Sequence, residues 1–238
     1  HRGLSKLFLG RMDYVIAQSR ESLLLLQKIA PHVKRELIIG PYFDAPVIKT
    51  VSKTHAQKKL GLKGNVLLFF GFVRPYKGLM TLIEAMPNIL SHTPVTLLIA
   101  GEFWQGKEAY VARARELKVE HALQIHDHFI PADHVNHYFA AADVVVVPYE
   151  AISQSAIIPT AFMHGVPVIA TQVGGNSDWI DSEKNGILVP PKNPNALAEA
   201  VVHFYTHKLE HPFRRGVKQR VRGMRWDHAK ENILLGRT

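Results

Sequence analysis

Residues 143–171 have the sequence DVVVVPYEAISQSAIIPTAFMHGVPVIAT, which carries the pattern of a strand, a polar loop, a helix and a second strand. The apolar run 144–147 predicts a buried strand. Residues 156–164 suit a short helix, which the following glycine would end, and residues 166–170 begin the next strand. Because these four segments together make one α/β unit, the stretch predicts the fold class of the chain.

The polar loop 149–155 inside this unit is the first candidate for a functional site. In open parallel sheets, ligands bind beyond the carboxyl ends of the strands, and this loop occupies that position. Ser153, Gln154 and Ser155 could cap the following helix, or they could bind phosphate oxygens or sugar hydroxyls. Glu150 is the only carboxylate in the loop. We therefore expect the chemistry of the protein to take place beside residues 149–155.

The alternation of strands and helices becomes regular from residue 55 onward. Strands are expected at 14–17, 36–41, 66–70, 95–100, 122–126, 144–147, 166–170 and 186–189, and helices at 18–26, 55–60, 79–90, 108–117, 134–142, 156–164, 195–205, 213–221 and 226–235. Residues 42–54 show no periodicity and are interpreted as a linker. Six strands that alternate with helices predict an α/β fold with a doubly wound parallel sheet, which is Rossmann-like.

Composition limits the class of protein. Apolar residues make up 47% of the 238 residues, and no run approaches the ~20 residues of a membrane-spanning helix. The chain has no cysteine, which fits a reducing compartment, and no signal-peptide pattern opens it. We therefore expect a cytoplasmic protein.

The net charge of +9 favours anionic partners, and much of the excess lies in residues 214–225. This basic segment could be a solvated helix face, or it could associate peripherally with an anionic membrane at the inner face. Binding to nucleic acid is the third alternative. We expect no nucleic-acid partner, because basic residues do not alternate with aromatic ones as they do in RNA-recognition motifs.

The loop 71–78 follows a buried strand and opens a helix. Gly71 allows the backbone to approach a ligand closely, and Arg74 and Lys77 add two positive charges at that position. This arrangement suits a diphosphate. The alternative is an ordinary loop with two surface cations.

Residues 101–108 nearly match the Walker A pattern of phosphate-binding loops. Glu108 stands where that pattern requires a hydroxyl residue, and a carboxylate there would repel phosphate. Gly101 is instead interpreted as a residue that lets the strand end lie close to a ligand. His128, Phe129 and Ile130 follow another strand end and would line the same crevice. The chain's histidines show no convincing metal-binding pattern, and we expect no metal site.

These motifs, in this order, resemble the C-terminal, nucleotide-sugar-binding half of a GT-B glycosyltransferase of glycosyltransferase family 4. The matching segments are 70–78 with 82–85, 98–101, 138–149, 165–171, 173–175 and 185–189. The likeness covers about residues 60–205. Residues 1–45 resemble the end of the N-terminal, acceptor-side domain, residues 46–212 the nucleotide-sugar-binding domain, and residues 213–238 the helices that cross back.

The resemblance implies transfer of a sugar from a nucleotide-diphosphate sugar, with retention of configuration and no obligatory metal. It implies an acceptor that is a glycan or a lipid-linked molecule, as in cell-envelope polysaccharide biosynthesis. The donor diphosphate would rest on Arg74 and Lys77, helped by backbone N–H groups of residues 153–156. The base would lie near residues 128–130.

The chain departs from the family pattern at two glutamates. The positions of that pair are Ile152 and Thr160 here. Thr160 could contact the nucleotide ribose weakly, and Glu150 is the candidate for the contact to the donor sugar. The family usually has an arginine directly after the first glycine of this loop. That position is Phe72 here, which leaves Arg74 to take the role of the arginine. A non-catalytic nucleotide-sugar-binding module, or a GT-B epimerase or phosphorylase, is the alternative function.

Overall fold

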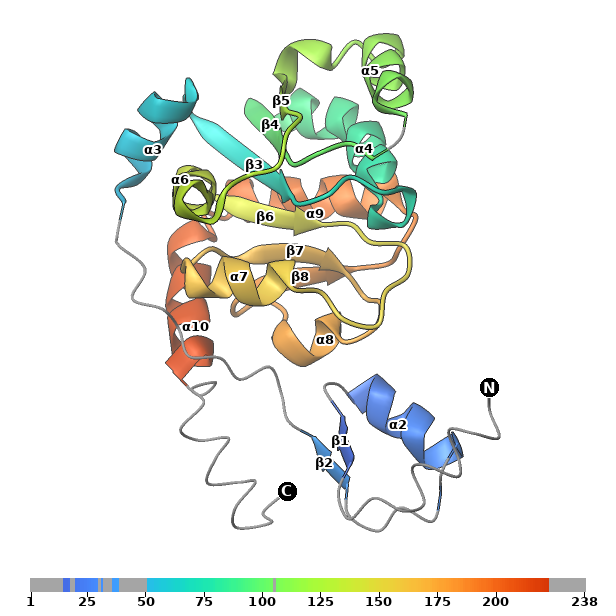
Figure 1. The fold of residues 1–238 in the computed structure, drawn as a ribbon. Coiled ribbons are helices and arrows are strands. Elements are labelled where there is room, and N and C mark those ends of the chain that lie inside the picture. Colours follow the sequence, from blue (N-terminus) through green and yellow to red (C-terminus); the bar gives the residue numbers. More distant parts are fainter. Residues whose placement is uncertain are drawn as a thin grey trace.

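Six parallel strands in the order β5-β4-β3-β6-β7-β8 form the centre of the computed structural model of this chain (Figure 1). The structure describes residues 15–17, 20–29, 31, 36–38, 51–104 and 106–222. The strands of the sheet are β3 (Asn65–Phe70), β4 (Val95–Ala100), β5 (Leu123–His126), β6 (Val144–Val147), β7 (Val168–Thr171) and β8 (Gly186–Val189). All neighbouring strands pair in parallel, which confirms the predicted fold class.

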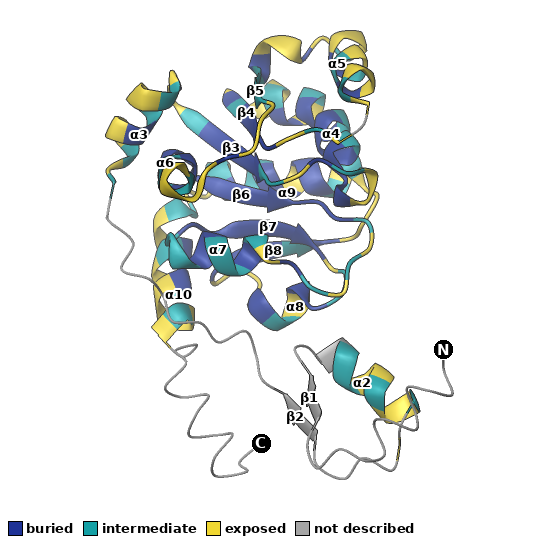
Figure 2. Cartoon of the chain, in the orientation of Figure 1, coloured by how far each residue is buried: buried dark blue, intermediate teal, exposed yellow. Residues whose placement is uncertain are grey.

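Helices cover both faces of this sheet. The helices are α3 (Lys53–Leu60), α4 (Leu79–His92), α5 (Lys107–Glu116), α6 (Ala132–Ala141), α7 (Ile157–Met163), α8 (Asn176–Trp179), α9 (Pro194–Thr206) and α10 (Glu210–Arg222), with the 3-10 turns η1 (Pro75–Lys77) and η2 (Glu120–Ala122). Helices α4, α5 and α9 pack into one hydrophobic core, and α3, α6, α7 and α8 pack into the other. Figure 2 shows the buried strands between helices whose outer surfaces are exposed. The sheet is therefore doubly wound.

Local sequence signals account for where the elements begin and end. The four valines of β6 are buried, as a strand covered on both faces requires. Helix α3 begins after Ser52, whose Oγ accepts a hydrogen bond from the His55 amide at 3.3 Å. Helix α7 is followed by Gly165 at φ +70°, and the amide of this glycine donates to the Phe162 carbonyl. The predicted glycine cap is thus confirmed.

The structure differs from the sequence-based expectations at a few boundaries. Helix α3 begins at Lys53, so the end of the expected linker 42–54 is helical, and residues 42–50 of that linker lie outside the described residues. Helix α8 was not expected, because its four residues are too few for periodicity to show. Strand β7 begins at Val168 instead of residue 166. The expected helix 226–235 lies outside the described residues.

The remaining described segment precedes the sheet in sequence. It comprises β1 (Val15–Ala17), α2 (Arg20–Ile29) and β2 (Glu36–Ile38), and the two strands pair in parallel. At the other end, α10 buries Phe213 in one core and Val217 in the other. The predicted domain boundary at 212/213 therefore falls inside a helix that packs on the sheet domain.

Candidate functional site

The loops after β3 and β6 meet at the topological switch point of the sheet, where the order of the strands reverses. The chain builds the sheet outward from β3 to β5 and then continues from β6 to β8 on the other side of β3. The two loops touch: the Glu150 amide donates to the Tyr76 carbonyl at 2.8 Å. A Cβ on Gly78 would lie 1.9 Å from the Pro148 carbonyl oxygen, so only glycine fits there. Such a switch point is where doubly wound sheets bind their ligands.

The carboxyl ends of β4 and β5 lie along the same edge of the sheet as the end of β3. The Gly71 amide donates to the Ala100 carbonyl at 2.8 Å, and the Gly101 amide donates to the His126 carbonyl at 3.0 Å. Gly101 has φ +146°, and a Cβ there would lie 2.3 Å from the Gly71 carbonyl oxygen. These contacts place the candidate glycines 71 and 101 side by side. Gly101 is thus needed for close packing of two strand ends, which is a structural reason for the glycine.

Lys77 lies at the switch point with its amine largely removed from water. The residue is 9% exposed, and its Nζ lies 3.2 Å from the position that a Cβ on Gly71 would take. The ring of Tyr149 lies below the amine, 5.8 Å from Nζ to the ring centroid. Burial, and after it the positive charge of Arg74, lowers the pKa of Lys77 to about 8.

Arg74 lies in the same loop as Lys77 and contacts an aromatic ring. Its guanidinium carbon lies 3.8 Å from the ring centroid of Trp104, and its Nε is buried without a hydrogen-bond partner. Among the residues that the structure describes, neither Arg74 nor Lys77 forms an ion pair with a carboxylate. Two neighbouring cations without acids favour a bound anion. Both cations were expected from the sequence, whereas Trp104 was not, because periodicity gives no signal for its contact with Arg74.

The polar loop places its residues in different environments. Ser155 is buried, and its Oγ accepts a hydrogen bond from the Ile157 amide at 3.3 Å. The N-cap residue of α7 is Ala156, not Ser155, so the bond to the Ile157 amide is a local turn before the helix instead of a side-chain cap. The carbonyl of Ser153 accepts a hydrogen bond from the Gly175 amide at 3.0 Å, and Ala156 is exposed. This loop is held in place by its neighbours.

Two further candidates are already engaged within the chain. The Glu150 carboxylate lies 3.1 Å from the Lys192 amine in a partly exposed ion pair. The Thr160 hydroxyl donates to the Ala156 carbonyl at 2.8 Å, within the first turns of α7. Gln154 is half-buried in the same loop. Glu150 and Thr160 would have to change partners to contact a ligand.

The residues expected to lie near a base have three different positions. His128 is exposed, and its ring stacks on that of His126 with centroids 6.1 Å apart. The Phe129 side chain is 64% exposed, whereas that of Ile130 is buried in the core with α6 and α7. Only the backbone of Ile130 can therefore face a ligand. Burial, and after it the charge of His128, lowers the pKa of His126.

Neither a metal-binding cluster nor a membrane-spanning helix is present among the described residues. Within them, no group of three or more histidine, cysteine or acidic side chains is placed to hold a metal ion. In that same part of the chain, every helix is too short or too polar to cross a bilayer.

A doubly wound sheet that carries two neighbouring cations at its switch point is an α/β domain suited to bind an anion. Comparison with known proteins identifies the family: the chain belongs to the glycosyl transferases group 1, whose family model matches residues 64–207. The fold expectation, the Rossmann-like C-terminal half of a GT-B glycosyltransferase, is confirmed by solved structures. Anabaena HepE in complex with UDP has a TM-score of 0.82 at 22% identity, covering 98% of this chain and 65% of that one.

A second solved structure and two curated relatives extend this result. The C-terminal domain of LpcC from Francisella tularensis has a TM-score of 0.68 at 20% identity, covering 75% of this chain and 96% of that one. The D-inositol 3-phosphate glycosyltransferase of Jonesia denitrificans is 30% identical over 211 residues, 83% of this chain and 50% of the relative. The putative glycosyltransferase YtcC of Bacillus subtilis is 34% identical over 168 residues, 66% of this chain and 40% of the relative. The chain thus spans about half the length of these relatives or less.

Proposed function

We propose that this chain is the donor-binding half of a retaining glycosyltransferase of family 4. It binds a nucleotide-diphosphate sugar, and the hexosyl group passes to a polysaccharide or glycolipid acceptor. The observation that carries the proposal is the pair of neighbouring cations, Arg74 and Lys77, which have no acidic partner among the described residues. Family membership and the structure of HepE with UDP-glucose support the same assignment.

The donor diphosphate would lie against Arg74 and Lys77 at the switch point. An ammonium and a guanidinium that donate no hydrogen bonds to carboxylates can direct their N–H groups at phosphate oxygens. When the bond to the sugar breaks, negative charge grows on the diphosphate, and two fixed cations in a partly dehydrated site stabilise that charge. The reaction as proposed needs no metal ion.

The base, the ribose and the sugar of the donor are assigned from the positions of the other candidate residues at the carboxyl ends of the strands. The base would lie near His128 and Phe129, beyond the end of β5, and the ribose near Thr160. The sugar would face Glu150, which stands two residues before the usual glutamate position. The acceptor would lie outside this domain, and the basic residues of α10 suit a location at the inner face of a membrane.

The test is a calorimetric titration of the 238-residue chain with UDP, GDP, ADP and their common sugar conjugates. We expect micromolar binding of one nucleotide. The double variant Arg74→Ala/Lys77→Ala should weaken that binding by at least a hundredfold, because each hydrogen bond to a charged group contributes about 1.5–3 kcal/mol. Equal affinity in the double variant would refute the diphosphate assignment, and binding of none of the nucleotides would refute donor binding.

A second candidate function is a nucleotide-sugar-binding module without turnover. One observation favours it: Ile152 and Thr160 stand where the family has its glutamate pair, and Glu150 is paired with Lys192. Turnover measured on the complete protein would separate the two, since the module would bind the donor and release no nucleotide.

A further inference from the structure

The large exposed apolar side chains of the sheet domain gather at one edge. Within the described residues between 51 and 222, they are Phe72, Tyr76, Trp104 and Phe129. All four lie in the loops that follow β3, β4 and β5. Exposed apolar groups scattered singly need no explanation, but a set confined to the ligand-binding edge does.

Three of these aromatic rings contact one another beside Arg74. The ring of Phe72 meets that of Trp104 edge-on, with centroids 5.4 Å apart, and lies 6.3 Å from the ring of Phe129. The guanidinium of Arg74 covers the face of Trp104. Trp104 thus contacts the ring of Phe72 and is covered on its face by a cation.

The backbone around Trp104 is fixed relative to the loop of Arg74. The Val73 amide donates to the Glu102 carbonyl at 2.9 Å, and the Phe103 amide donates to the Asp127 carboxylate at 2.9 Å. Val73 and Phe103 also form a parallel bridge. The indole ring is therefore presented to Arg74 from a rigid support, although 54% of Trp104 is exposed.

An aromatic face and a carboxylate hold an arginine in different ways. A carboxylate accepts the N–H groups of the guanidinium and neutralises its charge, so little is left for a ligand. An aromatic face attracts the cation through its plane and leaves the in-plane N–H groups free. The Nε of Arg74 is one such donor, because it is buried and has no hydrogen-bond partner among the described residues.

We infer that Trp104 is a positioning residue for Arg74: its indole ring fixes the guanidinium plane and keeps the N–H donors available to an anion. The inference rests on the proposed function only for the identity of that anion. The ligand class it requires is a diphosphate or a comparable oxyanion.

The test combines nuclear magnetic resonance of the arginine side chains with an anion titration. In the parent chain, the Nε–Hε signal of Arg74 should show a ring-current shift and a positive heteronuclear NOE. Trp104→Leu should abolish both, and Trp104→Phe should retain them. The affinity for inorganic pyrophosphate should fall five- to tenfold in Trp104→Leu and at most twofold in Trp104→Phe, in line with the strength of cation–π contacts.

Two controls separate positioning from a general effect on structure. Phe129→Leu removes an exposed ring of the same cluster that does not cover Arg74, and it should leave the Arg74 signal unchanged. In an Arg74→Ala background, Trp104→Leu should cause no further loss of pyrophosphate affinity, because residues that act through one another are not additive. A further loss there, or equal losses in the leucine and phenylalanine variants, would overturn the inference.

The two proposals fail differently. If the parent chain binds no nucleoside diphosphate, donor binding is refuted, while the Arg74 signal still decides the role of Trp104. If nucleotide and pyrophosphate bind and Trp104→Leu leaves the signal and the affinity unchanged, only the positioning role is refuted.

Discussion

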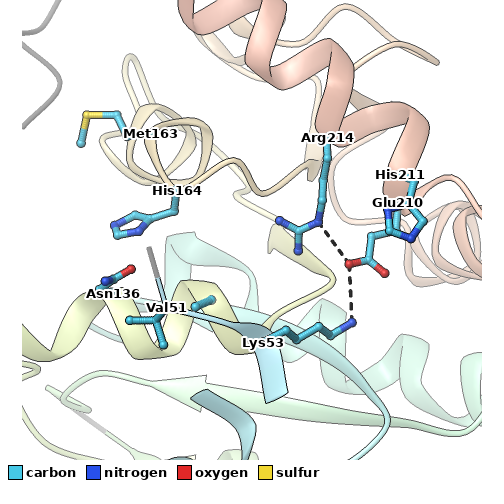
Figure 3. A pocket seen from close by; sticks show the side chains of 9 residues that line it. Val51, Lys53, Asn136, Met163, His164, Glu210, His211 and Arg214 are labelled. Carbon is cyan, nitrogen blue, oxygen red and sulfur yellow. Dashed lines mark hydrogen bonds and ion pairs between the residues drawn. The ribbon is translucent and has the colours of Figure 1, made fainter. Parts of the chain in front are cut away.

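Two pairs of cations, one at each end of the sheet, have partners of opposite kinds. At the amino end, Lys53 and Arg214 both lie against the Glu210 carboxylate, as Figure 3 shows. At the carboxyl end, Arg74 and Lys77 lie against aromatic rings and have no carboxylate partner among the described residues. Lys53 is the first residue of α3 and Arg214 lies within α10, whereas Arg74 and Lys77 lie between β3 and α4. The two pairs differ in the kind of partner, which is a carboxylate at the amino end and an aromatic ring at the carboxyl end.

The charged side chains of the amino-end network have hydrogen-bond or ion-pair partners within the chain. Arg214 donates to the Gly165 carbonyl at 2.9 Å, to the Ala142 carbonyl at 2.8 Å and to Glu210 at 3.1 Å. Asp143 accepts from Lys53, from the Val66 amide at 2.7 Å and from the Tyr205 hydroxyl at 3.3 Å. Burial nevertheless raises the pKa of Asp143. The cavity of about 390 Å³ beside this network is thus lined by charges that already have partners.

The comparison indicates which charges serve stability and which serve binding. A charge that is buried with its partner holds elements together, and removing one partner leaves an uncompensated charge. A charge that is buried without a partner makes the fold less stable. Proteins retain such charges at functional sites, where a ligand supplies the partner. Variants of one lysine at each end can test this distinction directly.

The largest effect is expected for Lys53→Met at the amino end. The variant leaves the Asp143 carboxylate buried without its cation, and the free energy of unfolding should fall by about 2–4 kcal/mol. The loss should shrink as the pH falls toward 4. This sign follows because a carboxyl whose folded-state pKa is raised destabilises the fold only where it ionises in the unfolded chain. Urea denaturation at several pH values measures both effects.

A matched control for Lys53→Met is Lys184→Met. Lys184 pairs with Asp181 at 2.9 Å, but the two side chains are 72% and 56% exposed. Its removal should change stability by less than about 0.5 kcal/mol. Equal effects of the two variants would show that the amino-end network does not hold the domain together.

Lys77→Met at the carboxyl end should have the opposite effect on stability. A pKa lowered from 10.5 to about 8 corresponds to a penalty of the order of 3 kcal/mol for the charged amine at pH 7. We therefore expect the variant to be more stable by about 1–3 kcal/mol and to bind the nucleotide diphosphate at least tenfold more weakly. Thermal unfolding and calorimetry on the same samples test this pair of outcomes. A destabilised variant would contradict the assignment of Lys77 to binding.

The pH dependence of Lys77 gives an internal check on that variant. A lysine with a lowered folded-state pKa binds fewer protons than the unfolded chain between pH 8 and 10.5, so the stability of the parent should rise across this range relative to Lys77→Met. Nucleotide affinity should fall over the same range as the amine loses its proton.

The contrast between the ends also explains what could be predicted from sequence. The β6–α7–β7 unit was predictable because its strands are uninterrupted apolar runs and a glycine ends its helix. Helix α8 was not, since four residues carry no period. Arg74 and Lys77 were predictable as a pair because a glycine-flanked loop after a buried strand has few structural uses for two cations.

The partners of those cations could not be predicted. Trp104 and Tyr149 meet Arg74 and Lys77 only because three strand ends converge, and this depends on the sheet order. The amino-end network was missed for the same reason, because Lys53, Asp143 and Glu210 are far apart in sequence. Ile130 follows the end of β5, but its side chain is buried in the core, which the sequence did not indicate. Contacts between distant segments are set by packing, which periodicity does not report.

The smallest effect is expected at Glu150, the one acid of the polar loop, because its carboxylate already has a partner within the chain, the Lys192 amine. Its ion pair with Lys192 is partly exposed, so Glu150→Gln should change stability by less than about 1 kcal/mol. If the carboxylate contacts the donor sugar as proposed, the variant should bind the nucleotide sugar about threefold more weakly and the free nucleotide diphosphate equally well. Lys192→Met, which frees the same carboxylate without removing it, should leave both affinities within twofold of the parent. Titration of the two variants with both ligands measures this difference, and a parallel loss for sugar-bearing and sugar-free nucleotide would place Glu150 with the structural charges of the amino end.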